Sequence, residues 1–132
     1  MRKDLDISAY LVVGPENTMG RPISDVIAQA LRAGFTCVQI RSKECSARDL
    51  VAYTIQAADV IAAAGKSKSV ALLVDDRLDV ALAAREAGAK VDGVHVGQTD
   101  IPVEVCRKLL GSDSIVGLSA RADEMLEYVK TA

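Results

Sequence analysis

A short segment of this chain directs two cations and an amide toward one side. In residues 38–44, which read V-Q-I-R-S-K-E, the polar residues Gln39, Arg41 and Lys43 occupy every second position. Because side chains alternate between the two faces of a β-strand, these three residues are predicted to share a face. Arg binds phosphate through a planar fork, and Lys binds it as a point charge. The spacing therefore predicts an anion site at a strand end, with a pair of solvated cations as the alternative.

Acidic residues follow two further strand-like runs. Ala71–Val74 leads into Asp75 and Asp76, and Gly93–Gly97 leads into a segment that contains Asp100. Carboxylate oxygens and substrate phosphates are the ligands that divalent cations such as Mg2+ prefer, so the acidic pair is a candidate metal site. A structural interpretation stays open for each: the pair could form a turn and a helix cap, and Asp100 could be an anion at a helix start.

Other catalytic chemistry has little support in the sequence. Ser119 follows the last strand-like run, but no G-x-S-x-G elbow surrounds it, so a serine nucleophile is not expected. His95 is the only histidine, and a lone histidine in a strand is expected to be a core residue with a satisfied hydrogen bond. The sequence contains no Walker motif, no G-x-G-x-x-G and no H-E-x-x-H.

Five short apolar runs alternate with helical patterns, most of which end in glycine. Repeated β-α order predicts a parallel sheet with right-handed crossovers. The predicted strands are Ala9–Val13, Cys37–Ile40, Ala71–Val74, Gly93–Val96 and Ser114–Leu118. The predicted helices are Ile23–Ala33, Ser46–Ala64, Leu78–Ala87, Pro102–Leu110 and Ala122–Lys130.

Two architectures fit this order, a doubly wound sheet and part of a (β/α) barrel. In the fourth predicted strand, Val94 and Val96 face one way while Gly93, His95 and Gly97 face the other. Helices cover both faces of a doubly wound sheet, so its central strands should be apolar on both. One mixed face favours the barrel, with a site at its mouth.

A receiver domain also has an acidic pair after a strand, but there the pair follows the first strand, not the third.

Composition narrows the partners. The chain has 132 residues, a net charge of −2, 3% aromatic residues and no Trp, which argues against nucleic-acid binding. No apolar run approaches the roughly 20 residues of a membrane span. The three cysteines are odd in number and lack C-x-x-C spacing, as expected for reduced thiols in the cytoplasm. We therefore expect a single barrel-type domain over residues 1–132, located in the cytoplasm.

Four motifs, in this order and spacing, together resemble the thiamin phosphate synthase family over nearly the whole chain. They are Q-x-R-x-K at residues 39–43, D-D-R-x-D-V-A-L-A at 75–83, D-G-V-H-V-G-Q-x-D at 92–100 and G-L-S at 117–119. The resemblance implies a (β/α)8 barrel transferase that uses Mg2+. The family joins hydroxymethylpyrimidine diphosphate to a thiazole monophosphate, giving thiamin phosphate and pyrophosphate. It does so through a dissociative mechanism without a protein nucleophile.

The resemblance also implies roles for individual residues. Arg41, Lys43 and Ser119 would be catalytic, and Asp76 and Asp100 would bind Mg2+. The implied substrate-binding set is Gln39, Arg41, Lys43, Asp75 and Ser119.

Three departures from the family pattern qualify the expected activity. Asp75 stands where the family usually has Asn, and Arg121 stands where it often has His. The chain also ends after the fifth β-α unit, before the family's later phosphate loops, so we expect open sheet edges and self-association. The alternatives are a non-catalytic or partner-dependent fragment and a thiazole tautomerase-like paralogue, which would lack the two metal carboxylates.

Overall fold

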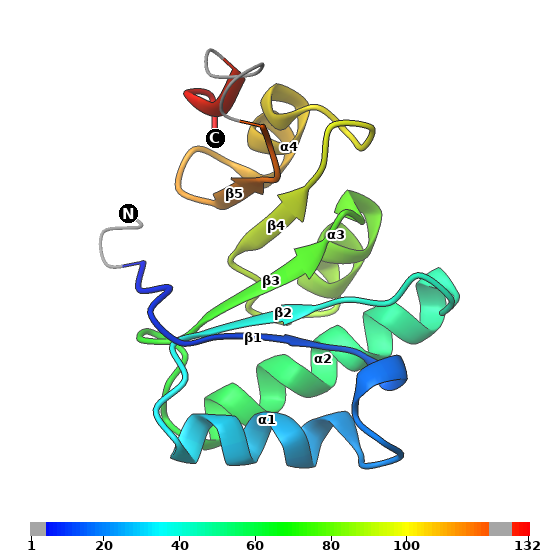
Figure 1. Cartoon of the computed structure of the whole chain (residues 1–132), viewed down its shortest axis with the longest axis vertical. Helices are drawn as coiled ribbons and strands as arrows, with labels where there is room; N and C mark the ends of the chain where they lie inside the picture. Colours follow the sequence, from blue (N-terminus) through cyan, green and yellow to red (C-terminus); the bar gives the residue numbers. More distant parts are fainter. Residues whose placement is uncertain (1–4, 122–127) are drawn as a thin grey trace.

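The computed structural model describes residues 5–121 and 128–132 and contains a five-stranded parallel sheet (Figure 1). The strands lie side by side in sequence order, and each pairs in parallel with its neighbour. Strands that pair in their sequence order are typical of a (β/α) barrel. In a doubly wound sheet, the strand order reverses beside the first strand. The barrel-type α/β fold is therefore confirmed. The strands are β1 Tyr10–Val13, β2 Cys37–Ile40, β3 Ala71–Asp75, β4 Gly93–Val96 and β5 Ile115–Leu118.

Four α-helices follow the first four strands, and their ends lie within one residue of the predicted ones. Ser46 caps α2, because its side chain accepts a hydrogen bond of 3.1 Å from the backbone N–H of Asp49. The predicted helix Ala122–Lys130 lies largely outside the described residues. The helices are α1 Ile23–Arg32, α2 Ala47–Ala63, α3 Leu78–Glu86 and α4 Val103–Leu110, with a 3-10 turn, η1 Pro15–Asn17, after β1.

The third strand is one residue longer than predicted. The strand was predicted to end at Val74, but Asp75 is the last residue of β3 and pairs with His95 of β4. The ladder extends to this pair because β4 runs alongside it. A strand position fixes the direction of a side chain, so Asp75 lies on the same face as Leu73.

The two faces of the sheet differ in what covers them. The main core joins strand residues such as Val38, Ile40 and Val94 to the buried sides of the helices. All four helices lie on this side of the sheet (Figure 1). On the opposite face, a second cluster contains strand residues only: Cys37, Leu73 and Ile115, with Tyr10 and Ala71 packed against them. One helix-covered face and one inner face are the arrangement that the strand patterns predicted.

All three cysteines are free. Cys37 and Cys106 are fully buried, and burial raises the pKa of the Cys37 thiol to about 11. Both therefore act as small apolar residues in the core. Among the described residues, no helix combines the length and apolar character needed to cross a membrane.

Among residues 5–121 and 128–132, the two outer strands of the sheet, β1 and β5, each have one edge with no paired strand. Unpaired strand edges bind other strands, so we expect the 132-residue chain to self-associate in solution. Light scattering should report a mass above the 13.9 kDa of one chain. Val12, on β1, is 40% exposed, and Val12→Lys should reduce the association because a charge at an edge strand opposes pairing. A monodisperse monomer would contradict this expectation.

Candidate active site

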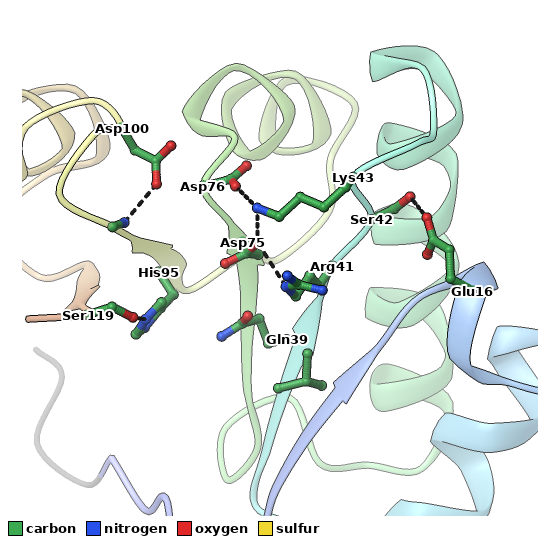
Figure 2. Close-up of polar contacts among 12 residues, drawn as sticks. Glu16, Gln39, Arg41, Ser42, Lys43, Asp75, Asp76, His95, Asp100 and Ser119 are labelled. Atoms are coloured by element: carbon green, nitrogen blue, oxygen red, sulfur yellow. Dashed lines mark hydrogen bonds and ion pairs between the residues drawn. The ribbon is translucent and has the colours of Figure 1, made fainter.

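The carboxyl ends of the strands bring together side chains that are far apart in the sequence. Figure 2 shows that these side chains gather at one end of the sheet. They come from β2 and the segment after it, from the end of β3, from β4 and the turn after it, and from the residue that follows β5. The set is Gln39, Arg41, Lys43, Asp75, Asp76, His95, Asp100 and Ser119.

Two cations and two carboxylates form the centre of the site. Lys43 Nζ lies 3.2 Å from Asp75 Oδ2 and also donates a hydrogen bond to Asp76 Oδ2. Arg41 Nε lies 3.5 Å from Asp75 Oδ2. The cationic side chains are about half exposed, at 48% and 54%, whereas the carboxylates are only 12% and 17% exposed. The cations can therefore turn toward a ligand while the carboxylates stay fixed.

The acidic neighbours keep Lys43 charged. The hydrogen bond to Asp76 is the largest cause that raises the pKa of the Lys43 ammonium, and Asp75 contributes in the same direction. Raising the pKa of an amine extends its protonated range, so Lys43 carries its charge throughout the neutral pH range. The structure thus places the two cations, Arg41 and Lys43, side by side. Both form ion pairs with the same carboxylate, that of Asp75.

Asp76 has an unusual backbone. Its φ is 51°, in the left-handed region, and its N–H donates a 2.6 Å hydrogen bond to the carbonyl of His95. Residues other than glycine are uncommon in this region, although Asp enters it more readily than most. The following helix α3 has Arg77 at its N-cap and no side-chain cap. The helix-cap interpretation of the acidic pair is therefore wrong.

Asp100 closes a turn rather than starting a helix. Its Oδ2 accepts a 2.7 Å hydrogen bond from the N–H of Gly97, and Pro102, not Asp100, precedes α4. Asp76 and Asp100 line the same cavity of about 550 Å³, together with the first turn of α3 and the loop before α4. The two carboxylates implied to bind metal thus lie on one cavity.

The donor set of this cavity fits Mg2+. The contacts of Asp76 with Lys43 and of Asp100 with Gly97 both use Oδ2, so they leave the Oδ1 atoms unused. In residues 5–121 and 128–132, no group of three or more His, Cys, Asp and Glu side chains is arranged to hold a metal ion. Mg2+ does not require such a group, because it commonly binds one or two carboxylates, waters and substrate phosphates.

Gln39 lies deeper than the charged cluster. It is 5% exposed, and its Nε2 donates a 2.7 Å hydrogen bond to Tyr10 Oη. Burial raises the pKa of the Tyr10 phenol to about 12, so this partner is neutral. The register puts Gln39 opposite Leu73, on the inner face that also carries Asp75. Gln39, Arg41 and Lys43 were predicted to share one face. In the structure the Gln39 amide is buried, whereas the Arg41 and Lys43 side chains are about half exposed.

Ser119 has a partner that the sequence interpretation missed. Its Oγ lies 2.8 Å from Nε2 of His95, and its carbonyl accepts a 2.7 Å hydrogen bond from Gln98 Nε2. His95 was expected in the core, but it is half-buried on the inner face of β4. The alternation of Gly93, His95 and Gly97 already contained the signal, because it put the imidazole on the mixed face.

The loop after β1 supports the cationic segment. Glu16, in η1, accepts a hydrogen bond from Ser42 Oγ, which lowers the pKa of the Glu16 carboxyl. A Cβ atom at Gly14 would lie 1.8 Å from the carbonyl oxygen of Arg41, so only glycine permits this approach. Nothing local in the sequence pointed to Glu16, because its partner is 26 residues away.

Comparison with known proteins agrees with the geometry. The family model for thiamine monophosphate synthase matches residues 9–132. The chain belongs to this family. It is similar to the thiamine-phosphate synthase of Corynebacterium efficiens, with 42% identity over 96% of this chain and 56% of the relative. The enzyme of the same name from Campylobacter jejuni is 34% identical over 100% of this chain and 59% of the relative.

A solved structure shows the same relationship. Thiamine phosphate pyrophosphorylase from Pyrococcus furiosus matches with a TM-score of 0.73 and 27% identity, covering 94% of this chain and 56% of that one. The chain therefore spans somewhat more than half the length of the relatives that it matches. The family resemblance of the four sequence motifs is confirmed.

The raised pKa of Lys43 gives a direct test of the cluster. Asp76→Asn should lower the pKa of Lys43 more than Asp75→Asn does, because the hydrogen bond to Asp76 is the largest contribution. NMR titration of the lysine side-chain nitrogens measures this, with Lys43→Arg identifying the signal. Asp79→Asn is the matched control, because Asp79 pairs with Arg77 at 2.9 Å. A larger effect from Asp75→Asn would contradict the geometry.

Proposed function

We propose that this chain acts in the coupling of hydroxymethylpyrimidine diphosphate with thiazole phosphate, which gives thiamin phosphate and pyrophosphate. One observation carries the proposal: Asp76 and Asp100 line one cavity, and Asp76 directly contacts Lys43 of the cationic cluster. A diphosphate needs both kinds of group, cations for its charge and carboxylates for the metal that accompanies it. The substrates are therefore small molecules. We place the reaction in the cytoplasm, in keeping with the free thiols.

In this reaction the bond between the pyrimidine methylene carbon and the diphosphate oxygen breaks first. The electron pair leaves with pyrophosphate, and the carbon becomes a resonance-stabilised cation that the thiazole nitrogen then captures. Arg41 and Lys43 stabilise the negative charge that develops on the leaving group. This scheme requires no protein nucleophile, in keeping with the absence of a serine elbow around Ser119.

Asp76 and Asp100 would hold Mg2+, which supplies further positive charge for the diphosphate. Lys43 contacts Asp76 Oδ2, but its side chain is 54% exposed and has the freedom to turn toward a phosphate oxygen. Asp100 is fixed by the N–H of Gly97, so its position does not depend on the ligand. In this proposal, Asp100 is the fixed group of the site, and Lys43 is the group that exchanges Asp76 for a phosphate oxygen.

Gln39 and Ser119 would contact the pyrimidine. Both side chains are held by partners from the neighbouring strands, Gln39 by Tyr10 and Ser119 by His95. Holding polar groups in fixed positions lowers the entropic cost of aligning a substrate.

A thiazole tautomerase-like activity is the second candidate. The family resemblance implies that such paralogues lack the two metal carboxylates, so the shared cavity of Asp76 and Asp100 favours the synthase.

Calorimetry with Mg2+ and pyrophosphate tests the metal assignment. Asp100→Ala should abolish the metal-dependent part of pyrophosphate binding while the circular dichroism spectrum stays unchanged. Asp79→Asn is the matched control, because Asp79 lines the same cavity but pairs with Arg77. Arg41→Lys should weaken binding about tenfold, because one arm of the bidentate fork is lost. Intact metal-dependent binding in Asp100→Ala would show that Asp100 only closes its turn.

The carboxylate of Asp75 competes with a diphosphate for both cations. Asp75→Asn should therefore tighten pyrophosphate binding without Mg2+, by about fivefold, which corresponds to roughly 1 kcal/mol for charges 4 Å apart in water. Calorimetry at low and high salt measures the effect, which should shrink as salt rises. Weaker binding in this variant would mean that Asp75 holds the cations in their productive positions instead.

A further inference from the structure

We propose that His95 is a positioning residue that contacts both Ser119 and Asp76, one of the two carboxylates proposed to bind the metal. Its ring sets the direction of the Ser119 hydroxyl, and its backbone carbonyl holds Asp76. The inference rests on the proposed function, because it takes Ser119 as the group that meets the pyrimidine. It adds to that function a residue that makes no contact with the substrate.

The ring of His95 has a defined position against β5. Its Nε2 lies 2.8 Å from Ser119 Oγ, within hydrogen-bond distance. On the other side of the ring, a Cβ atom at Gly117 would lie only 2.5 Å from Nδ1. The register places His95 directly opposite Gly117, so the absence of a side chain at Gly117 is what allows the ring to lie over β5. The packing therefore directs Nε2 toward Ser119.

The Ser119 hydroxyl needs such a partner. Ser119 is exposed and follows the last residue of β5, so the strand ladder does not fix its side chain. A serine hydroxyl rotates to suit whichever partner is near. Gln98 holds the carbonyl of Ser119 at 2.7 Å, which anchors the backbone but not the hydroxyl. His95 is the group that selects one hydroxyl direction.

The backbone of His95 acts on the metal side. The N–H of Asp76 donates a 2.6 Å hydrogen bond to the His95 carbonyl, and this bond holds Asp76 at its positive φ of 51°. The same strand residue therefore supports one carboxylate of the metal cavity and the hydroxyl proposed for the pyrimidine. Side-chain substitutions at His95 remove only the ring contact, because the carbonyl persists in every variant.

A first experiment tests the contact without any ligand. His95 is the only histidine, so its ring nitrogens give unambiguous signals in long-range 1H–15N NMR spectra of the full chain. Ser119→Ala should shift the ring nitrogen signals, that of Nε2 above all, because the hydroxyl beside Nε2 is lost. Ser112→Ala, an exposed serine on the loop after α4, is the matched control and should change neither. Unchanged ring signals in Ser119→Ala would overturn the proposal.

A second experiment tests the positioning role by calorimetry with two probes, hydroxymethylpyrimidine diphosphate and Mg2+–pyrophosphate. His95→Gln places an amide near the position of Nε2, whereas the shorter side chain of His95→Asn reaches only the position of Nδ1. His95→Asn should weaken binding of the pyrimidine diphosphate about threefold to tenfold, and His95→Gln should restore most of it. Neither should change Mg2+–pyrophosphate binding. Adding Ser119→Ala to His95→Asn should cause no further loss, because the two act through one contact.

The outcomes separate this proposal from the proposed function. If the unmodified chain does not bind the pyrimidine diphosphate, the proposed function fails and the positioning role fails with it. If the unmodified chain binds it and His95→Asn binds it equally well, only the positioning role is overturned. Equal losses for both probes, or additive losses in the double variant, would show that His95 stabilises the sheet rather than the hydroxyl.

Discussion

The candidate site depends on one constraint, the unbroken parallel order of the five strands. The carboxyl ends of parallel strands lie at the same end of the sheet. Residues that follow one strand therefore lie near residues that follow the neighbouring strand. Lys43 thereby contacts Asp75 and Asp76, although 32 and 33 residues separate them in the sequence. The His95–Ser119 contact crosses from β4 to β5 for the same reason. A shift of register by one residue would turn these side chains toward the helices, since neighbours in a strand face opposite ways.

The cations at the carboxyl end of the sheet are paired with carboxylates and still reach solvent. Ion pairs between exposed cations and carboxylates contribute only about 0–1 kcal/mol, because water solvates the separated partners well. Arg41 and Lys43 are half exposed, but Asp75 and Asp76 are only 12% and 17% exposed, so releasing the cations costs more than it would in a fully exposed pair. A diphosphate offers more charge and more acceptor oxygens than a carboxylate does. The internal pairs thus keep the cations in place without preventing their transfer to a ligand.

Local sequence patterns were sufficient for the strands and for most helix ends, because both depend on short-range periodicity and capping. β2 and β4 agree with their predicted ranges, and Ser46 caps α2 as its type suggests. The interpretation was less accurate where a residue's partner lies on another strand. Asp75 belongs to β3 because it pairs with His95, and that pairing depends on a register that no local pattern specifies.

Contacts of single atoms were further beyond reach. Asp100 has the residue type of a helix-start anion, yet it bonds to the N–H of Gly97, because a turn after β4 brings that group within 2.7 Å. The close approach of Gly14 to the Arg41 carbonyl follows from the distance between β1 and β2, not from the residues beside it. The motifs identified the family and the edge of the sheet, whereas the partners of each side chain follow from the packing of the strands.

The inner face of the sheet is graded from apolar to charged along the strands. Cys37, Leu73 and Ile115 form its buried cluster, and Asp75 and His95 follow toward the carboxyl ends. A charged group at the border of an apolar layer interacts more strongly with a ligand than it would in open water, because the local dielectric constant is lower. Under the proposed function, the substrate would have an aromatic ring at one end of this gradient and a diphosphate at the other. The ring would lie toward Gln39, at the apolar side, and the phosphates would lie toward the cations at the rim.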